Sequence, residues 1–328
     1  MTDQKKLRWN GGEVTMQPRG AMLRDLALTL EDGRITNPLH TAPWVGTSEA
    51  ETLDGLMQAL SGEWPCVPFG GPYQNLSTDW NKPPGWEDEF LHGYAAHHDW
   101  DVSSIDGGLE AEILMPEGHP IRSMSRRVMP TIDGIAIDLW VEPRRDCRLP
   151  IGLHPVFALP QEPERMTLHI DGATGVISHP ETPPFDTTPV RPNVLSDSLS
   201  SVQGTEGELL DFAHLPRPEQ SESRLLVLGS TGRVSLTDSE TGDVFSLSYD
   251  ADVFPFVMLW ISNRGRADAP WSGRHLALGV EPVRAAFDLG TATSAQENPL
   301  AAKGYETAYD FKADQSFHTR YTITAQST

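Results

Sequence analysis

The chain has 328 residues, of which 38% are hydrophobic and 8% aromatic, and this is enough apolar material to bury a large core. Its 46 acidic residues outnumber its 25 basic ones, and the formal net charge of −21 would repel phosphate backbones and anionic lipid surfaces. We therefore expect neither nucleic acid nor membrane as a partner, and the simplest role of the charge is a well-solvated surface.

The first residues, MTDQKKLRWNGGEV, contain no apolar segment after their lysines, and the chain has no run of about eighteen apolar residues. The sequence thus predicts neither a signal peptide nor a membrane span, and we expect the protein in the cytoplasm. The only cysteines are Cys66 and Cys147, which are too few for a disulfide framework or a cysteine-based zinc site.

Near the N-terminus, residues 27–30 and 34–36 alternate between apolar and polar and flank an Asp-Gly turn, a pattern typical of a β-hairpin. A helix is predicted next, from Ser48, where Glu51 completes a capping box, to Gly62. Its apolar face would carry Leu53, Leu56, Met57 and Leu60.

Residues 125–129 and 135–141 form a second predicted hairpin around an Asp-Gly turn. The proline-rich stretch 178–193 is predicted as a loop, because proline removes backbone donors from a sheet. Strand-like segments resume on both sides of this loop with the same character, so it does not resemble an interdomain linker. We therefore predict a single domain over residues 1–328.

The later segments continue the β pattern. Residues 224–230, 233–238 and 244–250 alternate and are separated by short glycine-containing turns, which predicts a three-stranded antiparallel meander. The apolar run at 276–280 is typical of a buried strand, and residues 321–324 alternate again. Together these segments predict an all-β fold, a large antiparallel sandwich.

Three ionisable residues stand beside glycine or proline where strands are expected to end: His92, His154 and Glu281. Active residues of β-sandwiches commonly lie on such loops at the edge of the scaffold. Taken singly, each fits a simpler role, because a buried histidine is usually structural and a glutamate after a strand often begins a solvated turn. Their shared context favours one common site.

The segments around these residues resemble the aldose 1-epimerase (galactose mutarotase) superfamily. HGYAAHHDW, which begins at His92, is similar to its HGFAR…W segment, GLHPVF to its GxHPYF motif, and LGVEPV to its glutamate motif, in the same order. EWPCVPFG, from Glu63, is similar to a loop of the hexose-phosphate mutarotase branch, and WISN, from Trp260, to a W-x-x-N strand. The resemblance spans about residues 60 to 290.

This resemblance implies a β-supersandwich that binds a free sugar in an open cleft and interconverts its α and β anomers without cofactor or metal. Glu281 would be the general base that takes the C1 hydroxyl proton, His154 the general acid that protonates the ring oxygen, and His92 a second donor. Ring opening needs such an acid and base together near neutral pH. Because a nearby carboxylate favours a charged histidine, Glu281 would also help to keep His154 protonated.

The expected ligand is a small-molecule sugar, whose C–H face aromatic rings would cover and whose hydroxyls polar side chains would hold. Where many family members carry an arginine, this chain has Ala96, and the stretch 71–75 lacks the arginine of the galactose mutarotase branch. We therefore expect an unphosphorylated or otherwise modified sugar. The predicted ligand contacts are Phe69, Tyr94, Trp100, Trp260, Asn263, Arg274 and Arg284, with Tyr73, Trp80, Trp271, Arg264 and Arg266 as further candidates.

Two other classes of function remain open. On the same fold, the protein could bind a carbohydrate without catalysis, as a sensor or an accessory module. In a cupin-like barrel, His92, His154 and Glu281 would instead form a two-histidine, one-carboxylate metal site, although cupin histidines usually occur as HxH, unlike the adjacent His97 and His98. Exposed sheet edges also leave a homodimer open.

Overall fold

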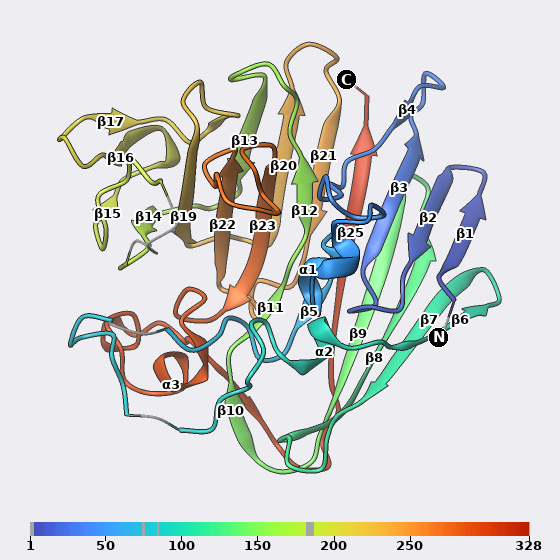
Figure 1. The fold of residues 1–328 in the computed structure, drawn as a ribbon, viewed down its shortest axis with the longest axis horizontal. Helices are drawn as coiled ribbons and strands as arrows, with labels where there is room; N and C mark the ends of the chain where they lie inside the picture. The colour runs from blue at the N-terminus through green and yellow to red at the C-terminus, as the bar shows by residue number, and fades with distance from the viewer. Residues whose placement is uncertain (1–2, 74–75, 84, 182–186, 328) are drawn as a thin grey trace.

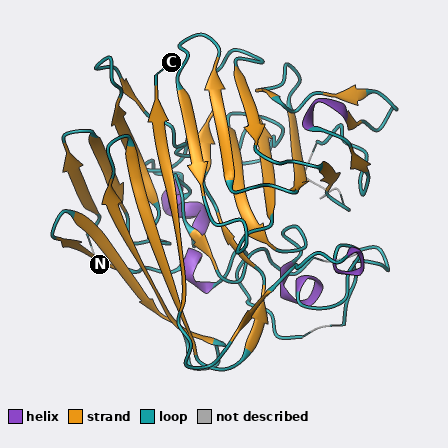
Figure 2. Cartoon of the chain, turned by 180° about the vertical axis from the view of Figure 1, so that it is seen from behind, coloured by secondary structure: helices purple, strands orange, loops and turns teal. Residues whose placement is uncertain are grey.

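The computed structural model describes residues 3–73, 76–83, 85–181 and 187–327 and consists mainly of antiparallel strands (Figure 1). Two large sheets face each other across a shared apolar core. Figure 2 shows that the short helices lie in the connections outside these sheets. Among the described residues, no helix is both long and apolar enough to cross a lipid bilayer. The predicted all-β sandwich is confirmed.

The larger sheet has nine strands within the described ranges, and its longest strands are adjacent at its centre. In sheet order, it consists of β18 (His214–Leu215), β13 (Met166–Ile170), β20 (Arg233–Asp238), β21 (Val244–Ser248), β25 (Phe317–Gln326), β9 (Gly134–Pro143), β8 (Ile121–Pro130), β7 (Gly108–Leu114) and β6 (Asp101–Ile105).

The second sheet has eight strands in the same described ranges, and it carries the residues of the site. Its order is β15 (Leu195–Ser196), β14 (Gly175–Ser178), β19 (Ser221–Leu228), β22 (Phe256–Asn263), β23 (Leu276–Arg284), β11 (Ile151–Leu153) and β5 (Pro65–Cys66), and β12 (Val156–Ala158) also pairs with β23.

Smaller elements complete the described fold. The additional strands are β1 (Lys5–Trp9), β2 (Gly12–Met16), β3 (Leu23–Thr29) and β4 (Ile35–Thr36) in one sheet, with the pairs β10 (Cys147–Leu149) and β24 (Tyr309–Phe311), and β16 (Val202–Gln203) and β17 (Leu209–Leu210). The helices are α1 (Leu56–Ala59), α2 (Tyr94–His97) and α3 (Gly290–Ser294), with 3₁₀ turns η1 (Ala50–Thr52), η2 (Leu199–Ser201) and η3 (Ala301–Lys303).

Strand β22 is buried on both faces. One face belongs to the main core between the two large sheets, and the other belongs to a second apolar cluster on the opposite side of the eight-stranded sheet. We call this second side the pocket face. The main core takes Val257, Leu259 and Ile261, and the pocket face takes Phe256, Met258 and Trp260. The alternation follows from the two-residue period of a strand.

A polar triad lies fully buried in the sandwich interior. Arg126 on β8 forms an ion pair with Glu63 and donates to the hydroxyl of Tyr321 on β25 at 3.1 Å. The Tyr321 hydroxyl donates in turn to Glu63, and a second guanidinium nitrogen of Arg126 donates to the Ala21 carbonyl at 3.1 Å. The triad therefore ties two strands of the nine-stranded sheet to the segment that precedes β5.

Both predicted hairpins are confirmed. Strand β3 pairs with β4 where residues 27–30 and 34–36 were expected to pair, and β8 pairs with β9 across the second Asp-Gly turn. The segment 321–324 lies within β25. The predicted loop 178–193 begins at the end of β14 and makes a single bridge at Val190, while residues 182–186 of it lie outside the described residues.

The predicted continuous helix from Ser48 to Gly62 is wrong. The segment forms the turn η1 and the four-residue helix α1, separated by Gly55, whose backbone has φ 54° and ψ −132°. At this bend the backbone N–H of Leu56 donates to His97 Nδ1 at 3.3 Å. A tertiary contact thus overrides the local helical pattern.

The predicted three-stranded meander is confirmed for two of its strands and wrong for the third. Strands β20 and β21 pair as expected, but β19 belongs to the other sheet, where it pairs with β14 and β22. The reason is that β19 is buried along nearly its whole length, so it needs cover on both faces. The predicted strand 276–280 also continues through Arg284, which puts Glu281 inside β23 and not at its exit.

We predict that Arg126→Met will lower the free energy of unfolding by about 3–5 kcal/mol, because it leaves the Glu63 carboxylate buried without its cation. Urea denaturation at pH 7 measures the loss. The matched control is Arg127→Met, one residue further along β8, where an exposed ion pair with Glu110 at 2.8 Å is expected to contribute less than about 1 kcal/mol. Equal, small losses in both variants would contradict the structural role of the triad.

Candidate active site

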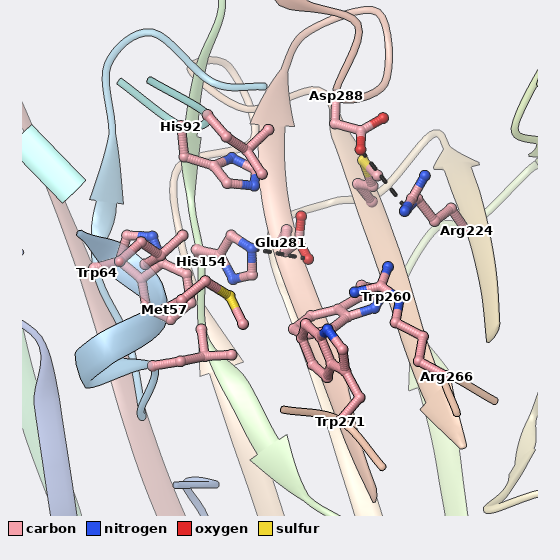
Figure 3. Close-up of a pocket in the computed structure, with 14 residues that line it drawn as sticks. Met57, Trp64, His92, His154, Arg224, Trp260, Arg266, Trp271, Glu281 and Asp288 are labelled. Atoms are coloured by element: carbon pink, nitrogen blue, oxygen red, sulfur yellow. Dashed lines mark ion pairs between the residues drawn. The ribbon is translucent and has the colours of Figure 1, made fainter. Parts of the chain in front are cut away.

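A pocket opens on the pocket face of the eight-stranded sheet and holds His92, His154 and Glu281 together (Figure 3). It contains about 600 Å³ of empty space when its open mouth is included. The sheet contributes the floor, and the segment that contains α1 forms one wall. The structure thus brings together the three ionisable residues that the sequence singled out.

The position of Glu281 follows from the register of two strands. Glu281 on β23 stands opposite Met258 on β22, and Gly279 stands opposite Trp260, so all four positions share the pocket face. A Cβ atom at Gly279 would lie 2.4 Å from Glu281 Oε1 and 3.1 Å from the Cβ of Trp260. Glycine at this position therefore makes room for the carboxyl group.

His154 lies between β11 and β12 and is held from several sides. Its backbone N–H donates to the Trp64 carbonyl at 2.9 Å, and its ring stacks on the Trp64 indole with 4.1 Å between centroids. Its Nε2 lies 3.4 Å from Glu281 Oε1. Within the described chain, neither His154 Nδ1 nor Glu281 Oε2 has a hydrogen-bond partner.

His92 precedes α2 in a turn with φ 63°, a left-handed conformation fixed by its N–H, which donates to the Gly70 carbonyl at 2.7 Å. The Gly70 N–H donates to His92 Nδ1 at 3.3 Å, so a neutral ring carries its proton on Nε2. The ring stands edge-on to His154 with 4.9 Å between centroids. Burial lowers the pKa of His92 to about 4, which makes it a neutral donor.

Burial disfavours the charged form of each of the two central groups. Burial raises the pKa of the Glu281 carboxyl well above its usual value, and the negative charge of Asp288 adds to this rise while Arg224 opposes it. Burial lowers the pKa of the His154 imidazole well below its usual value, and His92 lowers it further. We expected Glu281 to keep His154 protonated; the structure instead gives burial the larger effect.

An ionised carboxylate that the sequence analysis missed lines the same pocket. Burial acts to raise the pKa of Asp288, but the Arg224 charge and the His179 ring, whose Nε2 lies 2.8 Å away, together hold it well below its usual range. Tyr73 also donates to Asp288, at 3.3 Å, and accepts from Arg224 at 2.6 Å. The pocket therefore holds two carboxyl groups whose pKa values are shifted in opposite directions.

Aromatic rings form the wall opposite α1. Trp260, one of the predicted ligand contacts, lines the pocket and donates its indole N–H to the buried Glu222 at 2.6 Å. Trp271 packs edge-on against it, and the Arg266 guanidinium lies 4.6 Å from the Trp271 ring centroid. His275 stacks behind Trp260. Of the further candidates from the sequence, Trp271 and Arg266 thus lie in this pocket.

The other predicted aromatic contacts lie outside this pocket. Phe69 is fully buried behind the site, with its ring centroid 4.9 Å from that of His92. Tyr94 stacks on His98, and Trp100 lies in the main core, where it donates to a backbone carbonyl. These side chains support the segment that carries His92.

The predicted polar contacts also lie elsewhere. Asn263, at the end of β22, donates to the carbonyls of Arg217 and Glu219. Arg274 forms an ion pair with Glu49, and Arg284 donates to the backbone carbonyl of Val253. Over the described ranges, no group of three or more His, Cys, Asp or Glu side chains has an arrangement that could hold a metal ion.

The chain is similar in structure to several solved proteins. The chain is similar to a GalM/aldose epimerase homologue from C. elegans (12% identity, TM-score 0.65, all of both chains covered). The Slr1438 protein from Synechocystis sp. PCC 6803 shows 15% identity and a TM-score of 0.66 over 100% of this chain and 97% of that one. A galactose mutarotase-like protein from Lactobacillus casei shows 13% identity and a TM-score of 0.63 over 98% and 99%.

The chain has the galactose mutarotase-like fold. The resemblance read from the sequence is thereby confirmed at the level of the fold, and the cupin-like barrel is not the architecture of this chain. No protein-family model matches the sequence, and no curated protein matches it either. The galactose mutarotase-like assignment thus comes from the arrangement of the strands.

We predict that the protein loses stability as the pH falls from about 6.5 to 4, in part through His40, which lies edge-on to His275 behind the Trp260 wall. Burial lowers the pKa of His40 to about 4, so its contribution is complete above the unfolded value of 6.5 and is lost as the pH falls through 4. The shift corresponds to roughly 3 kcal/mol.

Urea denaturation at pH 7 and pH 4 of the wild type and His40→Gln measures this contribution. The variant is expected to lose less stability on acidification, while His214→Gln, at an exposed histidine, is expected to behave as the wild type. The prediction fails if His40→Gln and the wild type show the same pH dependence.

Proposed function

We propose that the protein is an aldose 1-epimerase-like isomerase that interconverts the α and β anomers of an unphosphorylated or modified sugar. The observation that carries this proposal is the buried pair of His154 and Glu281, 3.4 Å apart at the floor of the pocket. An acid and a base at this separation can act on two neighbouring oxygens of one pyranose, the C1 hydroxyl and the ring oxygen.

The unpartnered atoms of the pair support a ligand at this position. Buried polar atoms without partners are uncommon, and Glu281 Oε2 and His154 Nδ1 are two of them at one pocket within the described chain. A sugar supplies hydroxyl donors and acceptors for both. His92, with its Nε2 proton, adds a neutral donor beside them.

The proton balance of ring opening matches the pair. Transfer of one proton from Glu281 to His154 gives a carboxylate and an imidazolium without changing the total charge. Glu281 then takes the C1 hydroxyl proton while His154 protonates the ring oxygen, and the C1–ring oxygen bond breaks to give the aldehyde. Both groups return to the uncharged forms that burial favours, so the cost of buried charge falls only on the transient ion pair.

Reversal of the same transfers closes the ring. In the open chain, rotation about the C1–C2 bond presents the other face of the aldehyde to the C5 hydroxyl. His154 takes the proton of that hydroxyl, Glu281 returns its proton to the aldehyde oxygen, and the opposite anomer forms. Little of either side chain is open to solvent, so bulk water competes weakly for these protons.

Polarimetry of freshly dissolved α-glucose and α-galactose tests the proposal. The wild type is expected to speed anomerisation beyond the spontaneous rate, and Glu281→Gln and His154→Ala are each expected to lose a factor of roughly 10²–10⁴. His214→Gln serves as the histidine control. Wild-type rates no higher than those of the two variants would reject catalysis, and saturable sugar binding in that case would identify a non-catalytic carbohydrate-binding protein.

We also predict that Gly279→Ala will lower kcat by about tenfold or more, because the added methyl group displaces the Glu281 carboxyl. The displaced atom is the end of a side chain, so the free energy of unfolding is expected to change by less than about 2 kcal/mol. Polarimetry and urea denaturation of the same preparation separate the two effects. An unchanged kcat would show that the space at Gly279 does not position the base.

A further inference from the structure

The two sides of the pocket differ in chemistry (Figure 3). Beyond Glu281, away from His154, lie Asp288 and Arg224, which offer an acceptor and a donor for hydroxyl groups. Beyond His154, on the opposite side, lie Met57 and Trp64. The lining residues of this second side are all apolar: Leu56, Met57, Leu60 and Trp64.

Three backbone carbonyls of the apolar side are already engaged. The Met57 carbonyl accepts from the Trp44 indole at 2.7 Å, the Ala59 carbonyl accepts from Gln17 at 2.7 Å, and the Leu60 carbonyl accepts from a backbone N–H at 3.0 Å. The indole nitrogen of Trp64, which is also buried, has no hydrogen-bond partner within the described chain. A sugar hydroxyl placed against α1 would leave water without gaining a partner, which is unfavourable.

The roles proposed for the acid and the base fix which end of the sugar meets this side. In a pyranose, the ring oxygen joins C1 to C5, and C2 follows C1 in the other direction. With the C1 hydroxyl at Glu281 and the ring oxygen at His154, C2 and C3 extend toward Asp288 and Arg224. C5 and its substituent then extend past His154 toward Met57.

We infer that the preferred substrate is a 6-deoxyhexose, a reducing sugar that carries a methyl group at C5 where glucose and galactose carry a hydroxymethyl group. This inference rests on the proposed function, because it uses the positions assigned to the acid and the base. The methyl group packs against Met57 and the neighbouring leucines. The hydroxyls of C2 and C3 bind Asp288 and Arg224 on the other side.

Matched sugar pairs test the inference. The kcat/KM values for 6-deoxy-D-galactose against D-galactose, and for 6-deoxy-D-glucose against D-glucose, come from polarimetry with the spontaneous rate subtracted. We expect kcat/KM to be roughly tenfold higher for the 6-deoxy sugar in each pair, because the C6 hydroxyl of the other sugar would be buried without a hydrogen-bond partner. D-xylose, which has no carbon outside the ring, is expected to fall below 6-deoxy-D-glucose because it lacks the methyl contact.

A pair of variants on α1 assigns the preference to its wall. Met57→Gln is nearly isosteric and adds an amide that can bind a hydroxyl, so it is expected to reduce the preference to about twofold or less. Gln58→Met makes the reverse change at the next residue, which does not line the pocket, and is expected to keep the wild-type ratio. An unchanged ratio in Met57→Gln would overturn the role of this wall.

The outcomes distinguish this inference from the function on which it rests. Anomerisation of all the sugars with no preference for the 6-deoxy member, or a preference for the hexose, would overturn the inference and leave the isomerase proposal intact. Calorimetric titration of the same free sugars reports binding without catalysis. Tighter binding of the 6-deoxy sugars to a protein that does not catalyse would support the ligand class and reject the isomerase; no binding and no catalysis would overturn both.

Discussion

Two ionisable groups, the Glu281 carboxyl and the His154 imidazole, approach to 3.4 Å where almost no water reaches either of them. Such burial is costly unless the groups pair, accept hydrogen bonds or give up their charge. The structure meets this constraint in three ways. Gly279 leaves space for the carboxyl group, the Trp64 ring stacks on the imidazole, and burial shifts the pKa of each group toward its uncharged form.

The cover over this pair comes from segments that are not part of the two large sheets. The short helix α1 forms one wall, and Trp271 and Arg266 stand on the opposite side. The fully buried Arg126–Glu63–Tyr321 triad is linked to the pocket, because Glu63 is followed in the chain by Trp64, which lines it. The Glu63-Trp64 dipeptide is therefore one link between the sandwich interior and the pocket, beside strands such as β22 that have a face in each.

The sequence predicted what depends on local pattern. Hairpins such as β8–β9 have their turn signal between the paired strands, and His92, His154 and Glu281 stand in short motifs with a recognisable order. The position of β19 could not be predicted in this way, since an alternating pattern does not say which sheet a strand joins.

The sequence did not identify Asp288 and Arg224 as pocket residues, for a related reason. Asp288 depends on His179, 109 positions away, and Arg224 follows the polar stretch Ser-Glu-Ser in β19 with no motif around it. Conversely, Phe69 and Trp100 are aromatic residues within or beside motifs, yet their rings are fully interior. Composition identifies aromatic rings, and only the packing decides which of them a ligand can touch.

Strand β22 has one face in each apolar cluster. Its odd-numbered residues therefore pack in the sandwich core, and its even-numbered residues pack on the pocket face. Val257, Leu259 and Ile261 hold the sandwich closed, while Met258 and Trp260 shape the cavity. Substitutions at the even-numbered positions can change which ligand fits the pocket, while the odd-numbered residues continue to stabilise the sandwich core. Ligand specificity and the stability of the scaffold can therefore evolve separately at alternating residues of this one strand.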